Sequence, residues 1–532
     1  MEEQGSEFFT KGSAMRRGMM VLCLVAGLVV AEVSQPAGEE AGSAGTENAP
    51  STEPGGLSIE AARDTLRIRL QDAVLTALER NPDLSIQRLE PAIAKSYVAE
   101  ARAEFDPVLT ASAERDETKT QRFLGASPEP FELTSERTEY AAGLSQTLPT
   151  GTELSVDASI TGSESSIYAS EYSGDVSLTV TQPLLQGFGF GVNLADLRKA
   201  RADLEISRSQ LKGMAEELVA GTEQAYWDLY LTAEETRIQE ESLRLAERQL
   251  SESLERVAVG KLPELELAAV RAEVARRRGN LIDAQSRYEQ ARLDFLFLLN
   301  PTDRAPWSMV PVPLDRPSTA ADSLDDLTIC EQVALERRPD LEQARLAYRK
   351  GQLDVAYTRN GLLPRLDFFI TLGRTSYAQT FEEALPDPDS PFYRVDAGVS
   401  FDLGIPIRQE RARFTRAKRS REQLEYALQN MERMVQRDVR SAYTEVLRTR
   451  QQIEATRVTR DLQEKNLEAE LEKFRVGRST NLLVLQVQRD FTASQLDVIR
   501  AAVNYLNALV NLHVMEGTLL ECRGINIPSS EF

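Results

Sequence analysis

The residue types that most often carry metal or nucleophilic chemistry are scarce in this chain. It holds one histidine, His513, and three cysteines, Cys23, Cys330 and Cys522, among 532 residues. Metal sites and nucleophilic centres generally need several such side chains in one place. We therefore expect no metal, no cofactor and no catalytic residue. Cys330 occupies an apolar helical position and is interpreted as packing, and nothing in the spacing supports a Cys330–Cys522 disulfide.

A glycine-rich segment and the overall charge argue against two further kinds of function. The segment Gly187-Phe-Gly-Phe-Gly191 lacks the glycine spacing and the βαβ setting of a nucleotide-binding loop, so we interpret it as a strand-to-helix turn. The chain carries 62 basic and 83 acidic residues, a net charge of −21. Nucleic-acid binding needs a basic surface, so we expect no nucleic-acid partner.

One short motif occurs twice, each time between two long helical patterns. The copies are Arg256–Leu267 and Lys473–Val484, and each holds a Val-Gly pair followed by a basic residue. Gly260 and Gly477 stand where a helix would end, a position at which glycine adopts a positive φ without strain. Each motif is therefore interpreted as the tip of a helical hairpin.

The N-terminal segments are expected to lie outside the fold. A basic pair, an apolar run and small residues near position 31 are typical of a secretory signal, so residues 1–31 are predicted to be a signal peptide, with Met15 as an alternative start. Residues 32–65 are predicted to be a disordered spacer because they are rich in Gly, Ala, Glu, Ser and Pro. No other apolar run of about 18 residues occurs, so we expect an exported chain without a transmembrane helix.

The remainder of the chain contains an internal duplication. Leu78–Leu84 matches Leu335–Leu341 at an offset of 257 residues, and the two Val-Gly pairs match at an offset of 217. Such self-similarity indicates one structural unit used twice. The predicted parts are a first repeat at 66–299, a Pro-rich linker at 300–326, a second repeat at 327–512 and a tail at 513–532.

Two unusually long helical patterns lead to the tips. Heptad spacing of Leu, Val and Ile through 193–259 and 408–476 predicts coiled-coil packing. At the rise of an α-helix each pattern would span roughly 100 Å. The helices that return from the tips would be about half as long, with Pro263 in the first turn of one and Ser479 or Thr480 as the N-cap of the other. The predicted hairpins are 193–299 and 408–512.

Apolar and polar residues alternate in two regions between the helical patterns, 107–182 and 364–404. In Tyr393–Leu403, for example, the odd positions are apolar or aromatic and the even positions are Arg, Asp, Gly, Ser and Asp. This pattern fits a transmembrane β-barrel with lipid outside and water inside, and it equally fits a half-buried soluble sheet. The export signal and the lack of a partner core favour the barrel.

Taken together, these features resemble the TolC-type outer-membrane efflux proteins of Gram-negative bacteria over nearly all of 66–512. Each motif is weak alone, but their duplicated order, with helices of these lengths, is specific. The motifs that carry the resemblance are Leu78 with Asn81-Pro82-Asp83-Leu84, Phe105-Asp106-Pro107, Thr181–Gly187 with Asn193-Leu194, and the two Val-Gly tips.

The resemblance implies a fold, a place and a function. The fold is mainly α with β: a long coiled-coil α-helical barrel plus a transmembrane β-barrel closed across a homotrimer. The place is the cell outer membrane, with contact to its lipid, extending into the periplasm. The function is that of a passive exit duct in a tripartite efflux or type I secretion system.

In this family a periplasmic adaptor (membrane fusion protein), joined to an inner-membrane transporter, docks on the tips. The resemblance therefore implies adaptor contacts at both tips of this chain. The two glycines would also cap their helices, and the two roles are compatible. The expected docking residues are Val259, Gly260, Lys261, Leu262, Val476, Gly477, Arg478 and Ser479.

The sequence departs from the family just beyond the tips. Well-studied members place acidic residues beyond the second tip, whereas Leu483 and Gln486 occupy the comparable turns here. Glu264 and Glu266 follow the first tip instead. These four residues are the candidates for the pore constriction, which is then either acidic or apolar. The leucines around Leu483 are alternatively coiled-coil core.

The first repeat carries extra residues among its strands. The offset between the repeats falls from 257 at Pro107 to 223 at Pro183, so 34 residues are inserted. Strand patterns at 139–148 and 152–161, joined by a short turn, would give six strands per chain and a trimeric barrel of 18 strands. Alternatively, this hairpin lies outside the 12-stranded barrel that the family implies, and we prefer this simpler arrangement.

Two other classes of function remain as alternatives. A periplasmic adaptor also has a helical hairpin, but only one, flanked by small β-domains. A soluble periplasmic coiled-coil scaffold would not explain the amphipathic strands. The sequence leaves open the exported substrate and the identity of the adaptor and pump.

Overall fold

The computed structural model describes residues 65–123, 130–166, 169–260, 263–301, 306–318, 324–385 and 391–525. The predicted signal peptide and most of the spacer lie outside these ranges. The described residues form two compact units. A β-unit is built from Ala99–Lys199 and Gln352–Arg419, and a helical unit from the described parts of Gly55–Val98, Ala200–Gly351 and Ser420–Phe532.

The helices repeat in length and order, as the duplication predicts. The first and second copies of three elements have equal lengths of 11, 22 and 36 residues, and the two long helices have 64 and 68. The helices are α2 (Leu70–Arg80), α3 (Pro82–Ala103), α4 (Phe190–Asn193), α5 (Ala195–Ala258), α6 (Glu264–Leu299), α7 (Leu327–Arg337), α8 (Pro339–Asn360), α9 (Arg408–Arg475), α10 (Asn481–Glu516) and α11 (Leu519–Cys522). Of the helices described, none combines a bilayer-spanning length with a sufficiently apolar composition.

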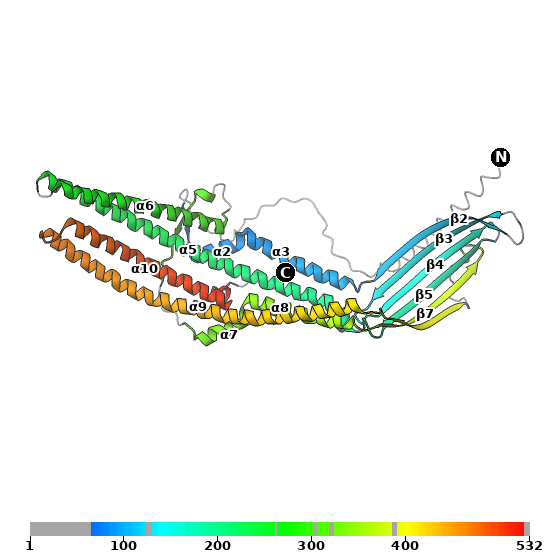
Figure 1. Ribbon diagram of the computed structural model, residues 1–532. Coiled ribbons are helices and arrows are strands. Elements are labelled where there is room, and N and C mark those ends of the chain that lie inside the picture. The colour runs from blue at the N-terminus through cyan, green and yellow to red at the C-terminus, as the bar shows by residue number, and fades with distance from the viewer. Residues whose placement is uncertain are drawn as a thin grey trace, which may run out of the picture. The chain divides into compact units, whose positions relative to one another are not determined.

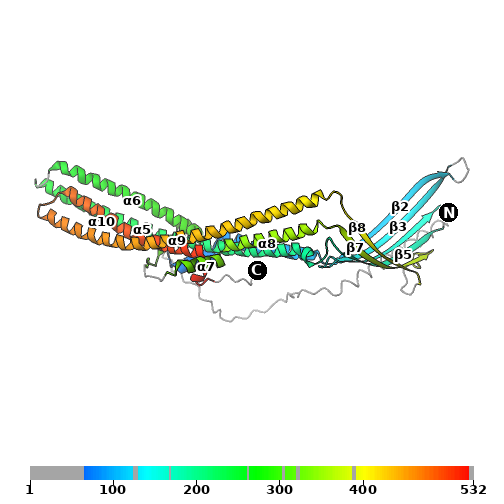
Figure 2. The same ribbon diagram turned by 60° about the horizontal axis from the view of Figure 1, so that its bottom comes forward.

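The β-unit holds one antiparallel sheet of six strands in the order β2-β3-β4-β5-β7-β8 (Figures 1 and 2). The first four strands of this order, β2 to β5, come from the first repeat and follow one another along the chain. The last two, β7 and β8, come from the second repeat. The strands are β2 (Val108–Phe123), β3 (Pro130–Thr147), β4 (Glu153–Ser165), β5 (Glu171–Pro183), β7 (Arg365–Ala378) and β8 (Tyr393–Asp402).

The inserted hairpin belongs to this sheet. β3 pairs with β2 from Val108↔Ser145 to Phe123↔Pro130, and on its other side it pairs with β4. Within one chain the hairpin is therefore part of the sheet, and the six strands per chain that the wider arrangement predicts are present. Several strands also continue beyond the roughly ten residues of alternating pattern, because ladder hydrogen bonds join the backbone whatever the side chains are.

The two helical hairpins, α5 with α6 and α9 with α10, lie side by side in the helical unit in both views (Figures 1 and 2). The core of the second hairpin contains Val439, Val446 and Ile453, which is the heptad series read from the sequence. In the first hairpin Tyr226 and Trp227 are buried in a second cluster. Apolar residues at heptad spacing therefore do pack as coiled-coil core.

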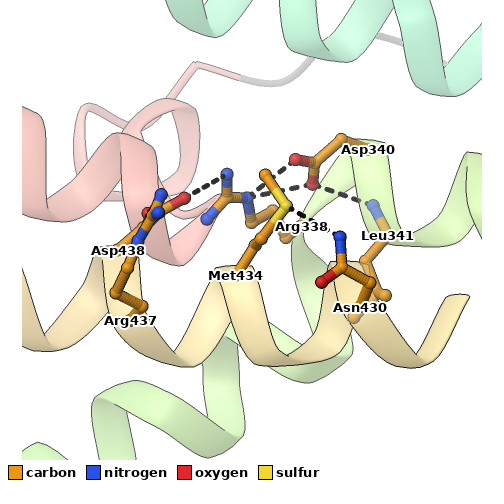
Figure 3. A network of polar contacts seen from close by, with 7 residues as sticks. All are labelled: Arg338, Asp340, Leu341, Asn430, Met434, Arg437 and Asp438. Atoms are coloured by element: carbon orange, nitrogen blue, oxygen red, sulfur yellow. Dashed lines mark hydrogen bonds and ion pairs between the residues drawn. The ribbon is translucent and has the colours of Figure 1, made fainter. Parts of the chain in front are cut away.

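The two repeats differ in the side chain that stands between their first two helices, at Asn81 and at Arg338. In the first, the Asn81 side chain accepts hydrogen bonds from the backbone N–H groups of Asp83 (2.9 Å) and Leu84 (3.2 Å), an N-cap for α3. In the second, Arg338 replaces the asparagine. Its guanidinium donates to Asp340 at 2.9 Å and to Asp438 of α9 at 3.4 Å, so it joins the start of α8 to the long helix (Figure 3).

One small element was not predicted from the sequence. β1 (Thr65–Ile68) pairs in parallel with β6 (Val310–Pro313), which lies in the segment expected to be a linker. A short helical turn, η1 (Pro306–Ser308), precedes it. The pairing joins residues about 245 positions apart, which local patterns do not reveal.

Candidate functional site

The first tip follows α5. Gly260 has φ +73° and donates its N–H to the Val257 carbonyl at 2.9 Å. The predicted left-handed glycine is thus confirmed. Val259 beside it is 66% exposed, and Pro263 takes the N-cap position of α6 rather than its first turn. Lys261 and Leu262 lie outside the described residues.

The second tip, after α9, has the same construction. Gly477 has φ +75°, its N–H donates to Phe474 at 3.1 Å, and that of Arg478 donates to Lys473 at 2.8 Å. This pair of bonds is a Schellman motif, which satisfies carbonyls at the helix end. Val476 is 68% exposed, like its counterpart at the first tip.

The return from the second tip is fixed by polar side chains. Thr480 is the N-cap of α10, with its hydroxyl accepting from the Leu483 N–H at 3.4 Å. The Ser479 hydroxyl instead donates to Glu470, which also accepts from the Lys473 ammonium at 2.9 Å. These bonds, that from Ser479 first, hold the pKa of Glu470 below its ordinary value. Ser479 therefore faces its own hairpin.

Just above the tips, the two hairpins are joined by a buried amide. The Asn481 carbonyl oxygen accepts from Gln249 of α5 at 2.9 Å, and its NH₂ group donates to the Ser253 hydroxyl at 3.4 Å. Because Asn481 is buried, losing these partners would leave polar groups unsatisfied, at a cost of about 1–3 kcal/mol. Asn481 thus holds α10 against α5.

Farther along the same helices a buried arginine makes a second link. Arg277 of α6 is 3% exposed. Its guanidinium donates to Glu273 at 2.9 Å, to the Ser242 carbonyl of α5 at 2.9 Å, and to Gln488 of α10 at 3.4 Å. Burial, with a smaller effect of Arg489, lowers the pKa of Arg277 from its ordinary value. One cation therefore connects three helices of both hairpins.

A third link is ionic. Glu235 of α5 is buried and accepts from Arg500 of α10 at 2.6 Å, while Arg287 of α6 lies 3.3 Å away. A buried carboxylate needs such partners, because an unpaired charge there is costly. Sequence reasoning did not single out any of these linking residues. One signal was available: Asn481 and Gln488 are polar and stand seven positions apart, which places them on one face of the returning helix.

The four constriction candidates lie in the first turns of the returning helices. Glu264 and Glu266 are exposed on α6, and Leu483 (44% exposed) and Gln486 are exposed on α10. Their neighbour Leu485 is buried, as expected of coiled-coil core. In one chain the four candidates thus point away from the packed core, so they are available to line a space between copies.

Cys330, Cys522 and His513 are the described residues of the types that most often bind metals or act as nucleophiles. Cys330 is buried in the core of the second hairpin, where desolvation raises the pKa of its thiol to about 12. Cys522 is exposed, 3.7 Å from His513, and both cysteines are free thiols. Among the described residues no group of His, Cys, Asp and Glu is arranged to hold a metal ion.

Comparison with solved structures shows the same fold in several outer-membrane channels. MtrE of Neisseria gonorrhoeae is 18% identical, with a TM-score of 0.61 over 85% of this chain and 89% of that one. VceC of Vibrio cholerae is 14% identical, with a TM-score of 0.62 over 84% and 96%. CmeC of Campylobacter jejuni is 16% identical, with a TM-score of 0.60 over 85% and 86%. No curated protein matches the chain.

A family model decides the identity. The model described as outer membrane efflux protein matches residues 74–300 and again 331–518, one match for each repeat. Both tips, both hairpins and all six strands of the sheet fall within these matches. This chain belongs to the outer membrane efflux protein family, whose members are outer-membrane channels of tripartite efflux systems.

Proposed function

We propose that three copies of this chain form the exit duct of a tripartite efflux or secretion system, and that a periplasmic adaptor, joined to an inner-membrane transporter, docks on the two tips. The chain is an outer-membrane protein that extends into the periplasm. The observation that carries the docking proposal is the equivalence of the tips: each ends in a left-handed glycine beside an exposed valine. Exposed loop residues that are held by a rigid scaffold are frequent sites of binding.

The proposed docking surface consists of the residues expected from the sequence, with one refinement. Val259, Gly260, Val476, Gly477 and Arg478 are exposed or form the turn itself. Ser479 would act indirectly, because its hydroxyl is bound to Glu470. Lys261 and Leu262, which lie outside the described residues, are included in the proposed surface because of their position in the sequence motif.

The transport itself is proposed to be passive, with energy supplied by the partner transporter. In the resting state, the links through Asn481, Arg277 and Glu235 would keep the hairpins together. Glu264, Glu266, Leu483 and Gln486 would then line the narrow end. Docking of the adaptor at the tips would separate the hairpins. The nearest link is at Asn481, the first residue of α10, so a movement of the second tip would act on this link first.

The test is to replace both tip glycines with proline, which cannot adopt a positive φ. Gly260→Pro with Gly477→Pro should abolish export while trimers still form. Gly524→Pro is a matched control, because Gly524 also has a positive φ and open space around its Cβ position, but lies in the tail. Unchanged export in the double variant would refute the docking role.

Membrane fractionation with chemical cross-linking separates this proposal from its rivals. The duct predicts a membrane-bound trimer, whereas a soluble periplasmic protein or a dimer would contradict it. Deleting the gene and profiling sensitivity to drugs, metal ions and other toxic compounds then identifies the class of cargo.

A further inference from the structure

The six-stranded sheet has two chemically distinct faces that continue through the inserted hairpin. In an antiparallel sheet, residues directly opposite each other project from the same face. One cross-strand row runs through all six strands and is apolar throughout: Leu109, Leu144, Val156, Leu178, Leu372 and Val395. The adjacent row, on the opposite face, is Thr110, Gly143, Asp157, Ser177, Gly373 and Arg394.

The inserted strands β3 and β4 thus supply their share of both faces. Leu144 and Val156 stand in the apolar row between Leu109 and Leu178, without a break. Leu109, Val156, Leu178, Leu372 and Val395 are all exposed in the single chain. An exposed apolar band backed by a polar face is what a wall between lipid and water requires.

Close packing on the polar face also fits the hairpin to its neighbours. A Cβ atom at Gly143 of β3 would lie 2.8 Å from the Asp157 carboxylate of β4 and 2.9 Å from the Thr110 hydroxyl of β2. Any larger residue at this position would have to displace these two polar side chains. The hairpin is therefore built into the sheet rather than laid against it.

The two outermost strands of this sheet are β2 and β8. In a bilayer an open edge is not tolerated, because its backbone groups would lack hydrogen-bond partners. If three copies close one barrel, as the proposed function holds, β2 of one copy must pair with β8 of the next. Every strand of the sheet then lies in the barrel wall.

We propose that three copies close a barrel of 18 strands, three times the six of each chain. This inference rests on the proposed trimeric duct. With strands about 4.8 Å apart and tilted by about 40°, the backbone diameter is about 36 Å for 18 strands and about 24 Å for 12. The inserted hairpin accounts for the difference.

The direct test is a cryo-electron microscopy map of the full chain in lipid nanodiscs. An 18-stranded wall of about 36 Å confirms the inference. A trimer with a 12-stranded wall, and residues 139–161 outside it, overturns the inference but leaves the exit duct standing. A particle that is not a membrane-embedded trimer refutes the proposed function instead.

Nitroxide labels test the lipid-facing surface independently, in a background lacking Cys330 and Cys522. Leu144→Cys and Val156→Cys should be accessible to oxygen in the bilayer and shielded from a water-soluble nickel chelate. Ser145→Cys and Ser155→Cys, one residue along each strand, are the matched controls and should show the reverse. Equal access of the chelate to all four positions would place the hairpin outside the wall.

Discussion

Arg256 and Phe474 connect the two tips directly. The Arg256 guanidinium, on α5, lies over the Phe474 ring of α9 at 4.9 Å from its centroid. An exposed cation–π contact of this kind is worth about 0.5–1 kcal/mol. Each tip thus ends a long helix of a different repeat, and this contact ties the two ends together beside the proposed docking residues.

Replacing Phe474 with leucine should weaken that tie without disturbing the helices. A loss of about 0.5–1 kcal/mol corresponds to a roughly two- to fivefold higher population of separated tips. The conducting fraction of single channels in planar bilayers should rise accordingly. Phe297→Leu is the control, since Phe297 is an exposed aromatic residue of α6, another helix of the same hairpin pair. An unchanged conducting fraction in Phe474→Leu would show that the contact does not restrain the tips.

Replacing Asn481 with leucine should loosen the link between α10 and α5. The change removes two hydrogen bonds and leaves the Gln249 side-chain amide without its partner, whereas the Ser253 hydroxyl keeps its bond to the Gln249 carbonyl at 2.8 Å. We expect a cost of about 1–3 kcal/mol and a leaky duct. Uptake of a large antibiotic by intact cells measures the leak, with Asn481→Gln as the polar control. Normal exclusion of the antibiotic by the leucine variant would contradict the role of Asn481.

Arg277→Met should destabilise the helical unit strongly. Removing one partner of a buried ion pair typically costs about 3–5 kcal/mol, and here the buried Glu273 would keep only Arg276. The thermal midpoint of the helical circular dichroism signal should fall. The double variant Arg277→Met with Glu273→Leu should recover part of the loss. If the double variant is less stable than Arg277→Met alone, the pair is not the source of the effect.

The stability of the helical unit should depend on pH through Glu216. Burial, only partly offset by Lys212, raises the pKa of Glu216 to about 7. Because the folded state holds this proton more tightly than the unfolded chain, stability from this group is greatest at low pH. It falls as pH rises from about 4.5 to about 7 and stays low above that range.

Glu216→Gln should remove this dependence. The variant should gain on the order of 1–3 kcal/mol relative to the parent chain at pH 8, and much less at pH 5. Thermal midpoints of the purified protein at both pH values measure the difference. Glu217→Gln is the neighbouring control, since Glu217 is exposed. An equal gain at both pH values would show that the carboxylate is not the cause.

Local sequence patterns predicted the helices and tips well because their causes are local. The positive φ of Gly260 and Gly477 follows from helix termination, and the burial of Val439, Val446 and Ile453 follows from heptad spacing. The two-faced character of the strands was likewise visible as alternation.

The features that could not be predicted depend on contacts between residues far apart in the sequence. Alternation identifies β3 and β4 as strands but does not say which strands they pair with, so the place of the hairpin inside the sheet could not be predicted. The β1–β6 pair joins distant segments in the same way. Arg277 lies in a run of three arginines, Arg276–Arg278, and only the packing of three helices singles out the middle one as buried.

The central claim is that the two tips are the docking end of an efflux duct. Site-specific photo-crosslinking in living cells tests it most directly, with a photoreactive phenylalanine analogue at Val259 or Val476. We predict that both positions form an adduct with the same second protein, and that its sequence is that of a periplasmic adaptor. The analogue at Tyr426, exposed on α9 far from the tip, should form no such adduct. Absence of the adduct at both tips, in cells that still export, would contradict the account.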